Sequence, residues 1–338
     1  MPVVVHIDPA WAVGPDGTVD RDRADIEREV YGTDTMVWFG PYHNGAFDVC
    51  GKAFLDTLRG ADAVAVYRAQ ITEEVVDALK PDCRGAARQG VGADNLDAGL
   101  LERHGIFGFN VPDYCVDEVS SHTIAMLLAL ERGLGTQDGL VKQGRWNIHA
   151  GGVPRRTGDL SVGVVGFGRI GRATSRKLKP FYRQVPAYGP YLHDDLMRGY
   201  GVQGRPSLAE PFYDADAVVP HAPLDDSTRH MINDEALRPL CRGALLVNTA
   251  RGGLVRPEAV LERLRDGRLG GYGADVFAPE NPRDHPVNKD IPTLPNTVVT
   301  SRRAFLPDAS ERSQRLRIAE EVRRVLPAGR QPFFGRPA

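Results

Sequence analysis

The chain has 338 residues, of which 42% are hydrophobic and 25% are charged, as in a globular protein long enough for two domains. Its formal net charge of −2 gives no electrostatic basis for binding nucleic acid or a membrane surface. No apolar run approaches the ~20 residues of a membrane span, and we expect no signal peptide. The four cysteines lie far apart, without disulfide-dense or CxxC spacing, so we expect buried free thiols in a cytoplasmic protein.

The first third of the chain alternates predicted strands with predicted helices. Strands are expected at 3–7, 36–39, 61–67, 85–89 and 106–110, and helices at 52–59 and 72–79. The hydroxyl of Thr72 is expected to cap the second of these helices. Alternation of this kind predicts parallel sheets.

The rest of the chain repeats the pattern. Apolar residues at helical spacing predict a long helix over 117–132, and a Gly- and Arg-rich stretch at 151–159 introduces a second alternating series. We expect strands at 162–165, 185–188, 215–219, 244–248, 271–276 and 296–300, and helices at 172–179, 234–240, 257–266 and 308–326. The whole pattern predicts an α/β protein with two doubly wound, Rossmann-like domains.

The most informative motif is Gly-Phe-Gly-Arg-Ile-Gly at 166–171, between a predicted strand and a predicted helix. Gly166 permits a tight turn, and Gly168 lets the backbone approach a pyrophosphate at the helix N-terminus. Gly171 lets the helix pack closely on the strand. In this context the motif predicts a dinucleotide site.

The acidic residue that usually accompanies this motif is missing. An acid about 20 residues further on holds the ribose hydroxyls of NAD, but this position is Gly189. Without a carboxylate to repel a 2′-phosphate, NADP(H) becomes permissible, although residues 190–193 are Pro-Tyr-Leu-His and include no arginine. NAD(H) bound through its pyrophosphate, and weak or absent dinucleotide binding, are the alternatives.

Charged side chains follow two further strands. Ligands of doubly wound sheets bind beyond the carboxyl ends of the strands. Arg251 follows the strand over 244–248, where its guanidinium can bind a carboxylate or a ketone oxygen. Asp275 lies at the end of the next strand and Glu280 follows it, where Glu280 could orient a catalytic base and raise its pKa. The alternative for these residues is a solvated charge at the edge of the sheet.

Six segments of the chain occur in one order: RQGVGADNLD, SSHTIAMLLALER, GVVGFGRIG, HAPLDDSTRHMIN, LVNTARGGLV and GADVFAPENP. Together they resemble the D-isomer-specific 2-hydroxyacid dehydrogenase family, over about residues 61 to 305. The resemblance implies a nucleotide domain over 105–295 and a discontinuous substrate domain formed by 1–104 and 296–338, with a cleft between them. It also implies NAD(H) or NADP(H) as cofactor and a homodimer formed through 122–132 and 141–146.

The resemblance also implies roles for individual residues. Arg251 matches the catalytic arginine, Glu280 matches the glutamate that pairs with the catalytic histidine, and Thr123 faces the nicotinamide region. The implied substrate-binding residues are Arg68, Val91, Gly92, Arg251 and Arg302. The implied cofactor-binding residues are Gly166, Gly168, Arg169, Ile170, Gly171, His221, Thr249, Ala250 and Asp275. No group of His, Cys and Asp residues has the spacing of metal ligands.

Arg302 stands where the family has its catalytic histidine. A guanidinium has a pKa above about 12 and releases no proton near neutral pH, and losing general acid catalysis lowers the rate on the order of 10²–10⁴-fold. Arg302 could bind an anionic substrate, stabilise a developing alkoxide, or simply pair with Glu280. Tyr114 or a water molecule could then supply the proton.

Two functions are compatible with these residues. The first is an NAD(P)-dependent oxidoreductase with atypical proton handling that acts on a small 2-oxo or 2-hydroxy acid. A doubly anionic substrate would suit the positive charge of four arginines, Arg68, Arg251, Arg302 and Arg303. The alternative is a repurposed or non-catalytic relative that binds a dinucleotide or another ligand, or that catalyses a different reaction on the same scaffold. The intact glycine motif favours the first function, and the two departures favour the second.

Overall fold

The computed structural model describes residues 1–79, 81, 83–190, 194–327 and 330–332. The chain divides into two compact units, Met1–Cys115 with Pro307–Ala338, and Val116–Leu306. The division differs from the expected one, because 105–115 belong to the first unit and 296–306 to the second. Strand pairing is the physical reason: Phe107–Asn110 joins the first sheet, and Thr297–Val299 joins the second.

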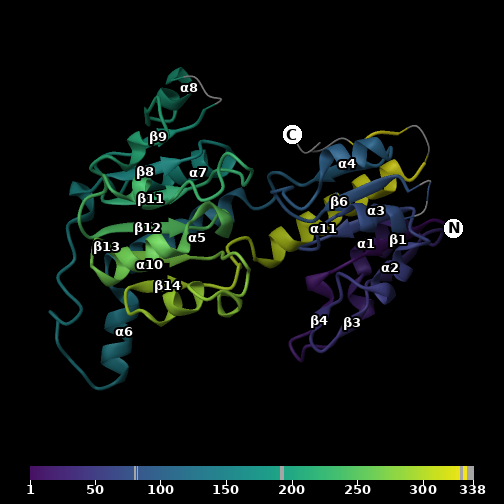
Figure 1. Cartoon of the computed structure of the whole chain (residues 1–338), viewed down its shortest axis with the longest axis horizontal. Helices are drawn as coiled ribbons and strands as arrows, with labels where there is room; N and C mark the ends of the chain where they lie inside the picture. Colours follow the sequence, from purple (N-terminus) through teal and green to yellow (C-terminus); the bar gives the residue numbers. More distant parts are fainter. Residues whose placement is uncertain (80, 82, 191–193, 328–329, 333–338) are drawn as a thin grey trace. The chain divides into compact units, whose positions relative to one another are not determined.

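The first unit is built on a parallel sheet with the strand order β2-β1-β5-β6-β7 (Figure 1). Its strands are β1 (Val3–His6), β2 (Met36–Phe39), β5 (Ala63–Val66), β6 (Gly85–Arg88) and β7 (Phe107–Asn110). Its helices are α1 (Asp25–Tyr31), α2 (Lys52–Leu58), α3 (Glu73–Ala78), α4 (Ala98–Arg103) and α11 (Asp308–Val325). The central strands β1 and β5 are buried along their whole length, as parallel strands covered by helices are. A small hairpin pairs β3 (Tyr42–His43) with β4 (Ala46–Phe47).

A buried ion pair connects the two sequence segments of the first unit. Arg315 on α11 donates from Nε and Nη2 to the carboxylate of Glu27 on α1, at 3.0 and 2.6 Å. Glu27 is fully buried, and the guanidinium lies over the Trp11 ring, 4.0 Å from its centroid. Because loss of either partner would leave a buried charge, this pair ties the C-terminal helix to the N-terminal segment.

The second unit is built on a parallel sheet with the strand order β10-β9-β8-β11-β12-β13-β14 (Figure 1). Its strands are β8 (Val162–Val165), β9 (Pro186–Tyr188), β10 (Gln203–Gly204), β11 (Ala217–Pro220), β12 (Ala244–Asn248), β13 (Leu269–Ala274) and β14 (Thr297–Val299). Its helices are α5 (Val116–Glu131), α6 (Leu134–Lys142), α7 (Arg169–Leu178), α8 (Asp194–Gly199), α9 (Asp234–Leu237) and α10 (Pro257–Arg265).

The strand order of the second unit reverses at β8. From β8 the chain builds outward through β9 and β10, and then returns to the other side of β8 with β11 and the strands that follow. The crevice between the carboxyl ends of β8 and β11 is where doubly wound sheets bind their ligands. The first sheet has its own reversal between β1 and β5. The predicted α/β class with parallel sheets is confirmed.

The local differences from the sequence predictions are small. Helix α7 begins at Arg169 rather than at residue 172, and α9 ends at Leu237 rather than at residue 240. The hydroxyl of Thr72 accepts a hydrogen bond from the Val75 backbone, so the predicted cap is confirmed. The sequence analysis did not predict helices α1, α4, α6 and α8 or the β3–β4 hairpin. These elements are short, and their hydrophobic residues show little periodicity.

All four cysteines are free, but only two of them match the expectation of burial. Cys83 and Cys115 are buried, whereas Cys50 is exposed and Cys241 is partly exposed. Cys50 lies two residues before α2, outside the hydrophobic clusters of the first unit. Within the described residues, no helix combines the length and the apolar character needed to cross a membrane.

Candidate functional site

The glycine motif forms the turn between β8 and α7. Gly166 has a φ of 98°, and a Cβ there would lie 2.6 Å from the backbone nitrogen of Ala222. A Cβ on Gly171 would lie 2.0 Å from the carbonyl oxygen of Gly166, so the helix touches the turn. A Cβ on Gly168 would meet nothing within 4 Å, so this position borders open space. The three glycines therefore suit a pyrophosphate at the N-terminus of α7.

His221 follows β11 beside the glycine turn. Its Nε2 atom is buried and has no hydrogen-bond partner among the described residues. Burial lowers the pKa of this imidazole to about 4, so the ring is neutral at physiological pH. A buried polar atom without a partner in the chain is commonly satisfied by a bound group. This part of the sheet edge therefore fits a dinucleotide.

Gly189 follows β9, at the position where the ribose acid is missing. A Cβ on Gly189 would lie 2.9 Å from the Cβ of Phe167 and 3.3 Å from its backbone nitrogen. Phe167 is buried and packs edge-on against Tyr200, with 5.7 Å between the ring centroids. Phe167, which lies between the first two glycines of the motif, thus fills the space beside Gly189. Residues 191–193, which the sequence analysis also considered, lie outside the described residues.

The loop after β12 is held by a buried asparagine. Asn248 donates from Nδ2 to the carbonyl oxygen of Arg251 at 2.8 Å, and its Oδ1 accepts from the Ala250 backbone at 3.0 Å. The half-buried Arg251 side chain donates to the carbonyl oxygen of Ala250 at 2.9 Å. The hydroxyls of Thr249 and Thr123 lie 2.7 Å apart, which ties the loop to α5. The loop therefore presents Arg251 from a backbone fixed at several points.

Asp275 follows β13 and organises the loop after β14. Its carboxylate is 3% exposed and accepts backbone hydrogen bonds from Arg303 at 2.9 Å and from Ala304 at 3.1 Å. The Thr300 hydroxyl donates to the same carboxylate, and the Asp275 carbonyl oxygen accepts from the Arg302 backbone at 2.8 Å. Both carboxylate oxygens are therefore engaged within the protein, and Asp275 acts on the site by shaping this loop.

His122 on α5 packs against the same loop. Its Nε2 atom lies 3.1 Å from the Thr300 hydroxyl and 3.7 Å from Oδ1 of Asp275. Burial lowers the pKa of this imidazole, although the neighbouring Asp275 opposes the shift. The ring is therefore neutral at physiological pH and supports the loop that carries Arg302.

Arg302 forms an ion pair with Glu280. The family resemblance predicts that Glu280 pairs with a catalytic histidine at position 302. The two side chains are 26% and 34% exposed, so the pair lies at a partly solvated edge. Arg302 has a φ of 53°, a region that histidine adopts more readily than most residues. Of the roles considered for Arg302, pairing with Glu280 is the one observed. The pair is neutral overall, and its guanidinium is not a proton donor near neutral pH.

The first unit carries its own charged group at the ends of β1, β5 and β6. Asp8 accepts backbone hydrogen bonds from Tyr67 and Arg68, each at 2.6 Å, and from Ala69 at 2.9 Å. Burial nevertheless raises the pKa of this carboxyl. Arg68 and Arg88 lie beside the Tyr67 ring, with their Cζ atoms 5.4 and 5.6 Å from its centroid. Two guanidinium groups therefore gather on one aromatic side chain.

Two of these residues were missed by the sequence analysis. Arg88, which is 5% exposed, is the last residue of β6, shortly before the half-buried Val91 and Gly92. Asn248 is the last residue of β12 and precedes Arg251. In both cases the available signal was a polar residue at the carboxyl end of a predicted parallel strand, where ligands bind.

The remaining predicted residues lie at the start of α7, in the first unit and in the loop after β14. Arg169 is exposed at the first position of α7, and Ile170 beside it is half-buried. Tyr114 belongs to the first unit, and burial raises the pKa of its phenol well above the usual value. Arg303 contributes its backbone to the Asp275 network. Within the described part of the chain, no group of His, Cys, Asp and Glu residues could hold a metal ion.

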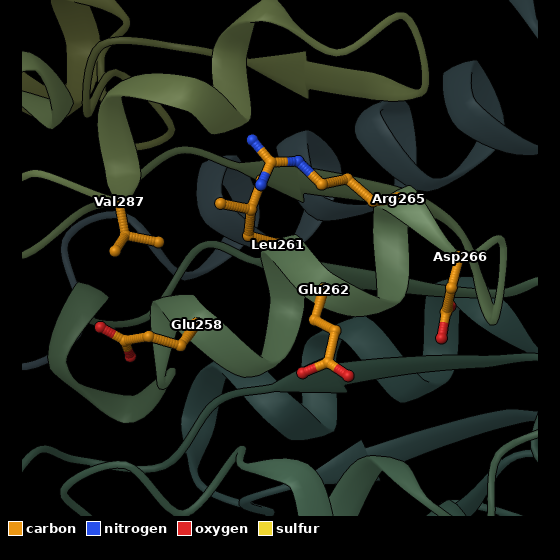
Figure 2. A pocket seen from close by; sticks show the side chains of 6 residues that line it. All are labelled: Glu258, Leu261, Glu262, Arg265, Asp266 and Val287. Carbon is orange, nitrogen blue, oxygen red and sulfur yellow. The ribbon is translucent and has the colours of Figure 1, made fainter.

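Two cavities of the second unit are lined by other residues than the predicted site residues. A surface cavity of about 440 Å³ lies along α10 and is lined by Glu258, Leu261, Glu262, Arg265, Asp266 and Val287 (Figure 2). None of these is a predicted site residue. A smaller cavity of about 90 Å³ lies behind the loops that carry Arg251 and Glu280, between Gly252 and Ala278.

A family model and two relatives point to the same protein family. Residues 124–304 match the family model described as "D-isomer specific 2-hydroxyacid dehydrogenase, NAD binding domain". The chain is 29% identical to D-3-phosphoglycerate dehydrogenase of Methanocaldococcus jannaschii over 276 residues, which cover 81% of this chain and 52% of that protein. The chain thus spans about half the length of this relative. It is 32% identical to glyoxylate reductase of Korarchaeum cryptofilum, with 80% of each chain covered.

Solved structures show the same fold. D-lactate dehydrogenase from Aquifex aeolicus, complexed with NAD and lactic acid, superposes with a TM-score of 0.81. The match covers 94% of this chain and 93% of that one at 24% sequence identity, so it bears on the fold alone.

Proposed function

The chain belongs to the D-isomer-specific 2-hydroxyacid dehydrogenase family, and from this premise we propose that it is an NAD(P)-dependent oxidoreductase acting on a small 2-oxo or 2-hydroxy acid. When bound, the nicotinamide supplies or accepts the hydride. One observation carries the proposal: the glycine turn after β8, Arg251 after β12 and Glu280 after β13 all follow parallel strands of one sheet. Ligands of such sheets bind along that edge.

The dinucleotide would be held by residues at the ends of several strands. Gly166 and Gly168 admit the pyrophosphate to the N-terminus of α7, and the buried Nε2 of His221 gains a partner. Asp275 contributes through the loop that it shapes rather than through a free carboxylate. The other proposed cofactor-binding residues are Arg169, Ile170, Gly171, Thr249 and Ala250.

Arg251 and Arg302 are the proposed substrate-binding and catalytic arginines of the second unit, with Glu280 as the partner of Arg302. The fork of Arg251 suits the carboxylate, and the Arg302 guanidinium offers a second positive charge. A doubly anionic oxo acid, such as a dicarboxylic or phosphate-bearing one, would use both guanidinium groups, its second anion competing with Glu280 for Arg302. Arg68, Val91 and Gly92 of the first unit are kept as substrate-binding residues on the strength of the family resemblance.

The proton for the reduced product must come from a group other than residue 302. Hydride addition to a ketone leaves an alkoxide, which Arg251 and Arg302 can stabilise electrostatically but cannot protonate. Tyr114 or a water molecule is the proposed donor. Burial raises the pKa of the Tyr114 phenol, which makes it a weaker acid than a free tyrosine and favours water as the donor.

Turnover of a panel of 2-oxo acids with NADH and NADPH tests this function. We expect measurable reduction, fastest with doubly anionic acids. Arg302→Gln is expected to lower kcat/KM for doubly anionic acids about 10- to 100-fold, because it removes a charged hydrogen-bond donor. Arg283→Gln, which removes an exposed charge from the loop after Glu280, is the matched control and should change little.

A second variant tests the geometry directly. Arg302→His places an imidazole beside Glu280 at a φ that histidine tolerates. We expect it to raise the reduction of monocarboxylic oxo acids on the order of 10²-fold or more, because it adds a general acid. If neither protein reduces any oxo acid and neither binds NADH or NADPH, the proposed function is wrong.

One observation favours a second candidate function. Because Arg302 is paired with Glu280, the residues at the histidine position are compatible with a protein that binds a dinucleotide or another ligand without the usual reduction, or that catalyses a different reaction. Tight dinucleotide binding by the wild-type chain, together with reduction appearing only in Arg302→His, would favour this alternative.

We also propose a cytoplasmic homodimer. Helix α6 has no buried residue, and it projects from the body of the second unit together with the loop that follows (Figure 1). That loop exposes Trp146 at 85% and Ile148 at 80%, which is unusual for large apolar side chains. Sedimentation velocity tests the proposal, and a monomer at micromolar concentration would contradict it.

A further inference from the structure

Two arginines on α7 gather around one tyrosine. The Cζ atoms of Arg172 and Arg176 each lie 5.8 Å from the centroid of the Tyr200 ring. Stacking on an aromatic face orients a guanidinium and leaves its N–H groups available at the rim. Arg172 is half-buried and also donates from Nε to the carbonyl oxygen of Gly168 at 3.3 Å. Its guanidinium therefore spans the distance from the glycine turn to Tyr200.

The cluster lies beside the position of the missing acid. Phe167, between the first two glycines, contacts Tyr200 on one side and fills the space next to Gly189 on the other. In a doubly wound dinucleotide site, the adenosine ribose lies at the end of the second strand, here β9, close to the glycine turn. The ribose of a dinucleotide bound at this turn would therefore lie close to Arg172.

The charge balance at this position favours an additional phosphate. None of the ion pairs among the described residues involves Arg172 or Arg176, and Gly189 supplies no carboxylate to accept the ribose hydroxyls. An unphosphorylated ribose would thus lose its usual acceptor, whereas a 2′-phosphate would meet two guanidinium groups and, at Gly189, no carboxylate.

We propose that the second unit prefers NADP(H) to NAD(H), with Arg172 and Arg176, oriented by Tyr200, as the ligands of the 2′-phosphate. This inference rests on the dinucleotide site of the proposed function. No arginine stands among residues 190–193, directly after Gly189. The structure instead brings the arginines from the neighbouring helix, through contacts with a tyrosine 11 residues beyond Gly189.

Calorimetric titration with adenosine fragments tests the inference without any turnover. The fragments are 2′,5′-ADP and 5′-AMP, which differ only in the 2′-phosphate. We expect 2′,5′-ADP to bind about 10- to 100-fold more tightly, since a charged hydrogen bond contributes roughly 1.5–3 kcal/mol. The double variant Arg172→Gln/Arg176→Gln should reduce this ratio to near one, and any loss of affinity for 5′-AMP should be smaller than the loss for 2′,5′-ADP.

Arg183→Gln is the matched control, because it removes an exposed cation of the same unit that lies outside the cluster. The control should keep the wild-type ratio. Equal affinity for the two fragments overturns the preference for NADP(H). A preference that survives the double variant overturns the assignment to Arg172 and Arg176. If neither fragment binds, the dinucleotide site itself is wrong, and the proposed function fails together with this inference.

Discussion

Two loops at the same edge of the second sheet are built on opposite principles. The turn after β8 owes its shape to residues that lack a side chain, since a Cβ on Gly166 or Gly171 would collide with backbone. The loop after β14 owes its shape to Asp275, which accepts hydrogen bonds from the backbone of Arg303 and Ala304. The Arg302 side chain takes no part in those bonds.

The difference explains why one loop keeps a recognisable motif and the other does not. In the glycine turn, residue identity and backbone shape are inseparable at Gly166 and Gly171, because a Cβ at either position would collide with backbone. In the loop after β14, the backbone is fixed by a residue from the preceding strand end, so position 302 can carry different side chains on one backbone. Chemistry at that position can therefore change while the fold stays the same.

The largest effect is expected in the glycine turn. Gly171→Ala puts a methyl group 2.0 Å from a carbonyl oxygen, and we expect it to lower the free energy of unfolding by about 4 kcal/mol or more, or to prevent folding of this unit. Gly168→Ala is the matched control, since its Cβ would meet open space and its φ is −69°. It should cost under about 1 kcal/mol and mainly weaken dinucleotide binding. Thermal unfolding measures both, and equal losses would contradict this account.

A smaller effect is expected from Asp275. Asp275→Ala removes the acceptor of two backbone N–H groups and of the Thr300 hydroxyl in a buried position, so we expect a loss of about 3–4 kcal/mol. Arg302→Ala removes only a partly exposed ion pair and should cost at most about 1 kcal/mol. Denaturant unfolding compares the two variants. If Arg302→Ala proves the more destabilising, the side chain at 302 shapes the loop after all.

The smallest effect is expected on the stability of the protein at acidic pH. His221, beside the glycine turn, has a pKa lowered to about 4, whereas Arg302 stays charged throughout. The unfolded chain, with a histidine pKa near 6.5, binds more protons between pH 6.5 and 4, so stability should fall as the pH drops through this window, by up to about 3 kcal/mol. His6 in the first unit, also with a pKa of about 4, should add a similar loss.

Thermal unfolding of His221→Gln across that range isolates the contribution of the second unit. We expect this variant to lose about half of the acid sensitivity and to match the wild type in shape above pH 7. An unchanged pH profile would show that the His221 ring is already protonated, or solvated, in the folded protein.

Local patterns predicted most of the elements. The strand at β8, the long helix α5 and the Thr72 cap were all evident, because periodicity and capping residues act over a few neighbours. The domain boundaries were misplaced by about ten residues, because membership of β7 and β14 depends on which strand they pair with. No local signal specifies that partner.

The candidate site shows the same division. Glycine spacing and the arginine after β12 were visible as motifs, and they remain the proposed binding groups. The structural role of Asp275, the supporting bonds of Asn248 and the filling of the Gly189 space by Phe167 were not visible. Each depends on contacts between residues that folding brings together from different strand ends.

Residue identities along the chain were enough to predict the class of fold, the glycine turn and the two departures from the family pattern, Gly189 and Arg302. Residue identity alone settles these points, since a glycine cannot bind a ribose hydroxyl through its side chain and a guanidinium cannot shuttle a proton. The folded structure was needed to show that Arg302 pairs with Glu280, that Asp275 holds the loop, and that Arg172 and Arg176 lie beside Tyr200. Partners of this kind are chosen by strand order and helix packing, which join residues that lie far apart along the chain.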